Sequence, residues 1–83
     1  MKVNVRYFAS IREALGPGEG VEVDAGATVG SVRDSLLSRD AAHSKALARG
    51  RALRSALNQV LCDEGAVVTD GAEVAFFPPV TGG

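Results

Sequence analysis

The sequence contains few of the residues on which cross-linked and metal-binding proteins depend. Its 83 residues include one cysteine, one histidine and no tryptophan. A single cysteine excludes a disulfide framework within the chain and is compatible with a reducing cytosol. The histidine has no second histidine or cysteine near it that would complete a set of ligands, so we expect no bound metal.

An excess of one charge and long apolar runs are also missing. Nine lysines and arginines are balanced by ten aspartates and glutamates, which gives no general reason to expect nucleic-acid binding. No stretch approaches the ~20 apolar residues of a membrane span, and residues 1–6 lack the apolar core of a signal peptide. The hydrophobic fraction of 46% is ordinary for a globular protein. We therefore expect one cytoplasmic domain over residues 1–83. A domain of this size has few residues to spare for a catalytic cavity of its own.

Strand and helix patterns alternate in the first part of the chain. Val3, Val5 and Tyr7 alternate with polar residues, as in a half-buried strand. Ser10 and Glu13 have the spacing of a capping box, which predicts a short helix that ends at the following Gly-Pro-Gly sequence.

The main helix is predicted after a second strand. Residues 21–24 alternate between valine and acidic residues, and we expect this strand to pair with the first. Thr28 can cap the helix that follows. Val29, Val32 and Leu36 fall at i, i+3 and i+7, which gives that helix one buried stripe.

The second half of the chain predicts another helical segment and three short strands. The segments are a helix over residues 41–48 that stops near Gly50, strands at 53–58 and 60–62, and a terminal strand after the turn at 70–71. There is no repeat, linker or low-complexity segment. This order predicts a mixed sheet that grips one main helix, an α+β roll.

Alternation places aromatic side chains on the sheet face opposite the helix. If Val74 and Phe76 face the helix, Phe77 points to the other side, and by the same reasoning Phe8 opposes Tyr7. Phe8 and Phe77 then form either a patch for a partner or a contact covered by loops. A contiguous exposed apolar surface would favour the partner.

The chain ends in Phe-Phe-Pro-Pro-Val-Thr-Gly-Gly, which predicts a projecting tail. Pro78 and Pro79 fix φ and cannot donate to a sheet, so they end the strand as an extended spacer. We expect a flexible tail at about residues 80–83, which spans at most about 13 Å. It fits a narrow channel because Gly82 and Gly83 lack Cβ atoms. The alternative is a frayed end or a cloning remnant.

The reactive group of such a tail is the terminal carboxylate of Gly83. At neutral pH this group is an anion and a poor electrophile, so it needs activation. The obvious route is an acyl-adenylate that a partner makes with ATP, followed by displacement with a sulfur nucleophile to give a thiocarboxylate. The chain has no phosphate-binding loop of its own, and we expect it to bind no cofactor.

The other reactive and charged side chains are predicted to be structural. Cys62 is predicted to be a small core residue and His43 a solvated helix residue. Six of the nine basic residues lie between positions 33 and 54, and we expect them to be solvated. The acidic residues that follow are Asp63, Glu64, Asp70 and Glu73. They form either another solvated face or an acidic end that steers the chain toward a basic cleft of a partner.

Three stretches carry a resemblance to a known family. They are VRYFASIRE at residues 5–13, ALNQ at 56–59 and GAEVAFFPPVTGG at 71–83. With these stretches the chain resembles the small subunits of molybdopterin synthase, sulfur carriers with the ubiquitin-like β-grasp fold, over essentially its whole length. One departure is Ala72, where the family usually has an acidic residue; it affects a turn more than the chemistry.

The resemblance implies a cycle of sulfur transfer. An E1-like activating enzyme adenylates the Gly83 carboxylate with ATP, and sulfur is installed as a thiocarboxylate. The tail then enters the large catalytic subunit of a heterotetramer and donates sulfur to a cyclic pyranopterin monophosphate, where two transfers build the dithiolene of molybdopterin. Gly83 thus bears the sulfur, and Gly82, which has no side chain, lets the tail thread into the partner. The resemblance also implies that the chain is no enzyme on its own. The implied partner-binding residues are Phe8, Phe77, Pro78, Pro79, Val80 and Thr81.

Three functions remain open at this point. The first is sulfur donation to molybdopterin synthesis. The second is a related carrier for the thiamin thiazole, which would use the same tail chemistry, although such carriers are usually shorter and lack the Phe-Phe-Pro-Pro run. The third is a ubiquitin-like protein tag, in which a lysine amine captures the activated carbonyl of Gly83.

Overall fold

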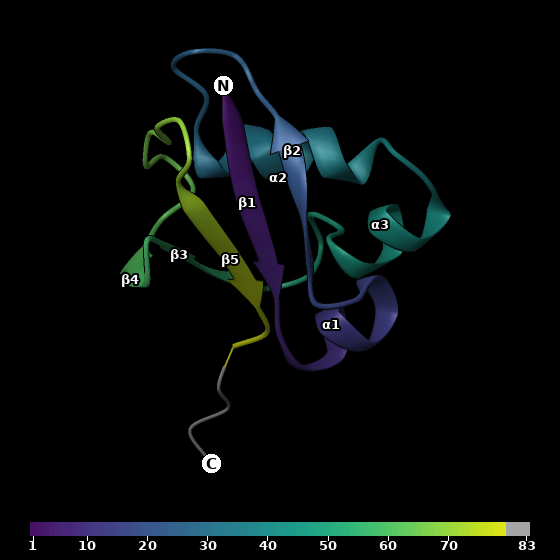
Figure 1. The fold of residues 1–83 in the computed structure, drawn as a ribbon. Coiled ribbons are helices and arrows are strands. Elements are labelled where there is room, and N and C mark those ends of the chain that lie inside the picture. The colour runs from purple at the N-terminus through teal and green to yellow at the C-terminus, as the bar shows by residue number, and fades with distance from the viewer. Residues whose placement is uncertain (80–83) are drawn as a thin grey trace.

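The computed structural model describes residues 1–79, and residues 80–83 lie outside the described part. The strands are β1 (Lys2–Tyr7), β2 (Gly18–Glu22), β3 (Arg54–Leu57), β4 (Val60–Cys62) and β5 (Glu73–Phe77). The helices are α1 (Ala9–Leu15), α2 (Val29–Leu37) and α3 (Ala41–Ala46). The strands form a five-stranded sheet in the order β2-β1-β5-β3-β4 (Figure 1).

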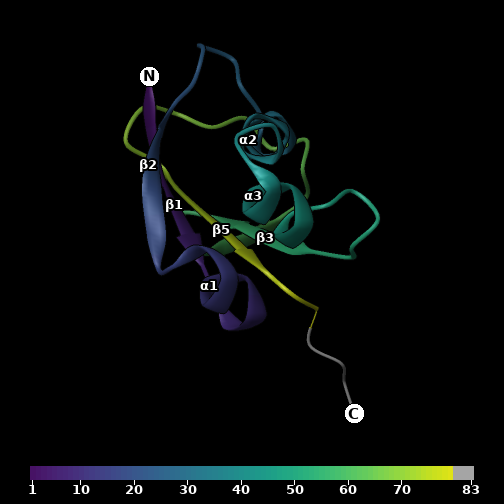
Figure 2. The same ribbon diagram turned by 90° about the vertical axis from the view of Figure 1, so that its right-hand side faces the viewer.

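The sheet is mixed and packs on one main helix. β5 lies in its middle, parallel to β1 and antiparallel to β3, and the pairs β1–β2 and β3–β4 are antiparallel. α2 crosses one face of the sheet, and within the described residues no helix covers the other face (Figures 1 and 2). The predicted α+β architecture is confirmed, including the pairing of the first two strands, but β2 runs over Gly18–Glu22 and not over the predicted residues 21–24.

The core lies between α2 and the sheet. The predicted stripe of α2, formed by Val29, Val32 and Leu36, is fully buried. The fully buried side chains that meet it come from the strands, α1 and the residue after α3: Val3, Val5, Tyr7, Ile11, Leu47, Val74 and Phe76. Burying each large apolar side chain contributes about 1.5–3 kcal/mol. These contacts therefore hold β1 and β5, the strands that carry the aromatic residues, in a fixed position.

α1 begins differently from the prediction. The capping box of Ser10 and Glu13 is wrong, because the helix begins at Ala9, the N-cap residue is Phe8, and no side chain caps it. The cause is strand pairing: the amide of Phe8 donates to the carbonyl of Phe76 at 3.3 Å, which continues the β1–β5 ladder by one residue. The Phe8 carbonyl then accepts from the amides of the first helical turn. The predicted stop is confirmed, since Gly16 ends the helix with φ +90°.

α3 is shorter than the predicted helix over residues 41–48. Asp40 caps it by accepting a hydrogen bond from the amide of His43 at 2.9 Å. The helix ends at Ala46, because Leu47 turns into the core and is fully buried. Gly50 therefore plays no part in ending this helix.

Arg33 was predicted to be solvated, and this prediction is wrong. Its exposed fraction is 3%, and its guanidinium donates to backbone carbonyls of the irregular segment that joins α3 to β3. These acceptors are the carbonyls of Leu47, Ala48 and Arg51, at 2.8, 2.5 and 3.2 Å. Its Nη1 atom also lies 2.6 Å from Glu64 Oε2. Arg33 thus holds the segment between α3 and β3 through its backbone carbonyls.

Candidate functional site

The C-terminal segment leaves the molecule from the middle of the sheet. β5 ends at Phe77, Pro78 is half-buried and Pro79 is exposed. The last pairings of β5 are Arg54 with Phe77 on one side and Tyr7 with Phe76 on the other. The base of the segment is therefore anchored on both sides. Val80, Thr81, Gly82 and Gly83 lie outside the described residues, so their predicted roles stay predictions.

Phe8 and Phe77 contact each other at this base. Their ring centroids are 6.5 Å apart and the ring planes are inclined by 85°, an edge-to-face arrangement. Phe8 is 38% exposed, and the guanidinium of Arg6 lies 5.8 Å from its ring centroid. The predicted aromatic patch outside the core is therefore present, while its role in binding stays a prediction.

Leu61 extends this patch and was missed in the sequence. In the sheet register Ala75 of β5 pairs with Ala56 of β3, which pairs with Leu61 of β4, so their side chains share one face. The two alanines are buried, whereas Leu61 is 62% exposed. We call the surface formed by Phe8, Phe77, Ala75, Ala56 and Leu61 the outer patch. Its exposed members are Phe8 and Leu61, and its role as a surface for a partner stays a prediction.

Of the acidic residues after position 62, Asp63 and Asp70 are exposed, as predicted, whereas Glu64 and Glu73 are half-buried. Each of the four carboxylates has a partner among residues 1–79: the amide of Gly65 for Asp63, Arg33 and Arg49 for Glu64, the amide of Lys2 for Asp70 and Arg6 for Glu73. Burial alone would raise the pKa of Glu64, but hydrogen bonds from Arg49 and Arg33 hold it below its usual value. These carboxylates serve local turns and ion pairs, so an acidic steering surface has no support in the geometry.

His43 was predicted to be solvated, and this prediction is wrong. Its side chain is 13% exposed and lies between two carboxylates. Nε2 is 2.7 Å from Oε2 of Glu19, and Nδ1 is 2.8 Å from Oδ1 of Asp40. Burial alone would lower the pKa of His43, but the hydrogen bonds and charges of Glu19 and Asp40 outweigh it and raise the pKa.

The same carboxylate of Glu19 binds two further side chains. It accepts a hydrogen bond from the buried hydroxyl of Tyr7 at 2.7 Å and pairs with Arg39. Burial and the contact with Glu19 raise the pKa of Tyr7, so this hydroxyl stays protonated. The cluster joins β1, β2 and α3 on the helix side of the sheet, away from the outer patch.

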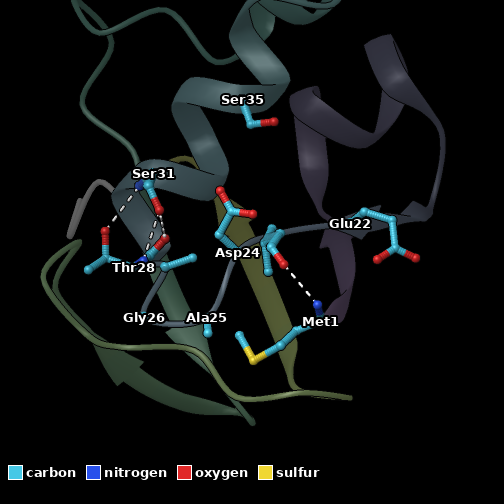
Figure 3. A pocket seen from close by; sticks show the side chains of 10 residues that line it. Met1, Glu22, Asp24, Ala25, Gly26, Thr28, Ser31 and Ser35 are labelled. Carbon is cyan, nitrogen blue, oxygen red and sulfur yellow. Dashed lines mark hydrogen bonds between the residues drawn. The ribbon is translucent and has the colours of Figure 1, made fainter.

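A hollow lined by Met1 and by residues of the connection between β2 and α2 lies at the end of the sheet opposite to Phe77 (Figure 3). The amino group of Met1 donates to the carbonyl of Val23 at 2.9 Å. Thr28 and Ser31 are occupied with each other in the capping box of α2. The other polar side chains among the described residues that line the hollow are Glu22, Asp24 and Ser35.

Cys62 is half-buried and packs against the core, as predicted, with Sγ 3.8 Å from Oγ of Ser55. Within residues 1–79 no three histidine, cysteine, aspartate or glutamate side chains gather in a way that would hold a metal ion. The helices of this part are all too short or too polar to cross a bilayer.

The fold and the outer patch define a class of protein. A mixed sheet wrapped around one helix, with an apolar patch beside the strand from which the C-terminal segment leaves, is a small ubiquitin-like β-grasp protein. The chain belongs to the ThiS family, whose model matches residues 5–83. A relative from Escherichia coli (strain K12), the molybdopterin synthase sulfur carrier subunit, is 42% identical, and the match covers 98% of this chain and 99% of that protein.

Solved structures agree with the family. The crystal structure of small archaeal modifier protein 1 from Haloferax volcanii matches with a TM-score of 0.77 and 30% identity, over 95% of this chain and 98% of that one. A chain in the complex of subunits 1 and 2 of the molybdopterin-converting factor from Helicobacter pylori matches with a TM-score of 0.70 and 26% identity, over 100% of both chains. These matches confirm the predicted β-grasp fold.

Proposed function

We propose that this chain is the sulfur carrier subunit of a molybdopterin synthase and that the C-terminal carboxyl group of Gly83 carries the sulfur. The observation that supports this most is the 42% identity, over nearly the full length of both chains, to a molybdopterin synthase sulfur carrier subunit. The described body of the chain agrees with a carrier, since its apolar patch lies beside the end of β5.

The proposed chemistry takes place on the acyl group of Gly83. The carboxylate attacks the α-phosphorus of ATP on an E1-like activating partner, pyrophosphate leaves, and an acyl-adenylate forms. Hydrosulfide adds to the activated carbonyl and AMP leaves, which gives the thiocarboxylate. In the transfer step the thiocarboxylate sulfur replaces an oxygen substituent on a carbon of the pterin precursor, so that a C–S bond forms as a C–O bond breaks. Water then cleaves the acyl–sulfur bond and restores the carboxylate.

The body of the chain serves as the binding surface for the large catalytic subunit. The outer patch supplies apolar area, and the anchored end of β5 sets the point from which residues 80–83 reach into the partner. Two glycines lose much conformational entropy when they are confined in a channel, so contacts of the body must supply free energy of binding.

Intact mass spectrometry of the protein purified from its own cells tests the proposal. We expect a fraction heavier by the difference between sulfur and oxygen, with the added mass located on the C-terminal peptide. A chain that lacks Gly83 serves as the matched control and should show no heavier form. A complete absence of the heavier form in cells with active molybdoenzymes would contradict the proposal.

One observation favours a second candidate, a ubiquitin-like protein tag. The fold matches small archaeal modifier protein 1, and both functions begin with activation of the terminal carboxyl group. They differ in the nucleophile, which is sulfur for the carrier and a lysine amine for the tag. The same mass spectra distinguish them, since conjugates to lysine without any thiocarboxylate would favour the tag.

A further inference from the structure

Two arginines border the outer patch on the same face of the sheet. Arg54 pairs with Phe77 across the β3–β5 ladder, and Arg6 pairs with Ala75 across the β1–β5 ladder. Side chains of paired residues lie on the same face of the sheet, and in an antiparallel pair such as Arg54 and Phe77 their Cβ atoms are about 4.5–5.5 Å apart. Arg54 therefore lies beside Phe77 and Arg6 beside Ala75, so that one cation stands at each side of the end of β5.

Carboxylates hold these two guanidinium groups less closely than they hold three other arginines. Arg33 is buried against Glu64, and Arg39 and Arg49 are each held in short ion pairs. Arg54, by contrast, is exposed and takes part in none of the ion pairs formed among residues 1–79.

Arg6 is only loosely held. The exposed fraction of its side chain is 48%, and its one carboxylate partner in the described part, Glu73, lies 3.7 Å away. Its guanidinium also stands over the ring of Phe8. One glutamate against two arginines leaves this border of the outer patch positive, although the whole chain has a net charge of −1.

We propose that Arg6 and Arg54 bind carboxylates on the partner, so that the surface docking on the outer patch is apolar in the centre and acidic at its edge. This rests on the proposed function, in which the partner is the large catalytic subunit. A guanidinium presents a planar fork of donors that matches a carboxylate in two hydrogen bonds. Charges at the edge of an apolar interface raise the association rate and exclude partners of the wrong sign.

Stopped-flow association of the full-length chain with the large subunit from the same organism, measured from low to physiological salt, tests this proposal. The variants are Arg54→Glu, Arg6→Gln and Arg54→Lys. Lys45→Glu is the matched control, because Lys45 is an exposed cation on α3, on the helix side of the sheet. Circular dichroism confirms that each variant is folded.

We expect Arg54→Glu to lower the association rate constant by roughly threefold to tenfold at low salt and to weaken its salt dependence. Arg6→Gln should act in the same direction with a smaller effect. Arg54→Lys keeps the charge, so it should keep the association rate and raise the dissociation rate. Lys45→Glu should leave both rates within about twofold of the wild type, since it lies away from the patch.

The outcomes separate this inference from the proposed function. Suppose that the wild type binds and that Arg54→Glu associates as fast as Lys45→Glu, or faster than the wild type. The inference of an acidic edge on the partner is then wrong, while the carrier function stands. If the wild type does not bind the large subunit at all, the proposed function fails and the inference fails with it.

Discussion

The Nε2 atom of His43 lies 2.7 Å from Oε2 of Glu19, which attaches α3 to the edge strand β2. The same oxygen accepts a hydrogen bond from the hydroxyl of Tyr7 at 2.7 Å, so the contact reaches the central part of the sheet. His43 is the single histidine of the chain, and its titration can therefore be followed without interference.

The pH dependence of stability should report this contact. The pKa of His43 is raised in the folded protein, so its contribution is fully present below the unfolded pKa of about 6.5 and is lost as pH rises through the folded value. The pKa of Glu19 is lowered, because hydrogen bonds from His43 and Tyr7 outweigh burial, so its contribution is lost as pH falls through the folded value. We expect His43→Gln to cost on the order of 1 kcal/mol below about pH 6.5 and progressively less as the pH rises through the raised pKa of His43.

Urea unfolding of wild type and His43→Gln across this pH range measures the effect, and an NMR titration of the histidine ring measures its pKa directly. A difference in the free energy of unfolding that does not change between pH 5.5 and 8 would show that the ion pair is not formed.

A side chain at position 18, in place of Gly18, should destabilise the fold. A Cβ atom at this position would lie 2.3 Å from the carbonyl oxygen of Val5, inside the β1–β2 pairing. Since this neighbour is backbone, the strands must move apart, and we expect Gly18→Ala to cost about 2 kcal/mol or more of unfolding free energy. Gly50→Ala is the matched control, because nothing lies within 4 Å of its Cβ position, and it should change stability by no more than about 0.5 kcal/mol. Equal effects of the two substitutions in urea unfolding would contradict the close approach.

Leu61 and Val60 offer a matched pair for the outer patch. Both are exposed, at 62% and 67%, but consecutive residues of a strand point to opposite faces, and Leu61 alone belongs to the patch. We expect Leu61→Asp to weaken binding to the large subunit by about 10–100-fold, because it places a charge in the apolar centre of the interface. Val60→Asp should leave the affinity nearly unchanged. Isothermal titration calorimetry measures both, and a larger loss for Val60→Asp would place the interface on the other face.

The register of the C-terminal residue should be critical if Gly83 carries sulfur. One alanine appended after Gly83 moves the reactive carbonyl by one residue, about 3.3–3.6 Å along an extended chain, and should abolish molybdoenzyme activity without changing the fold. Complementation of a strain that lacks this chain is the measurement, with circular dichroism as the control for folding. Full activity of an extended and unprocessed chain would rule out the mechanism, and a thiamin requirement in that strain would indicate the thiazole pathway instead.

Much of the fold could be predicted from local pattern. The period-two alternation around Val3 and Val5, the stripe of α2 and the cap at Thr28 depend on neighbours in the chain, and the structure confirms each of them. The placement of Phe8 and Phe77 outside the core followed from the same alternation. The helix start at Ala9 was missed, because pairing of Phe8 with β5, a strand far along the chain, overrides the local capping signal.

The sequence by itself determined which elements form, their order along the chain, the mixed sheet on one helix and the family resemblance. Periodicity, caps and motifs depend on residues that are close together in the chain. Only the tertiary structure decided that Arg33 and His43 are enclosed, that Arg54 lies beside Phe77 and that Leu61 shares the face of Ala75. These facts depend on strand register and on partners many residues away in the chain. In addition, β4 has three residues, which are too few for alternation to decide which of its faces points outward.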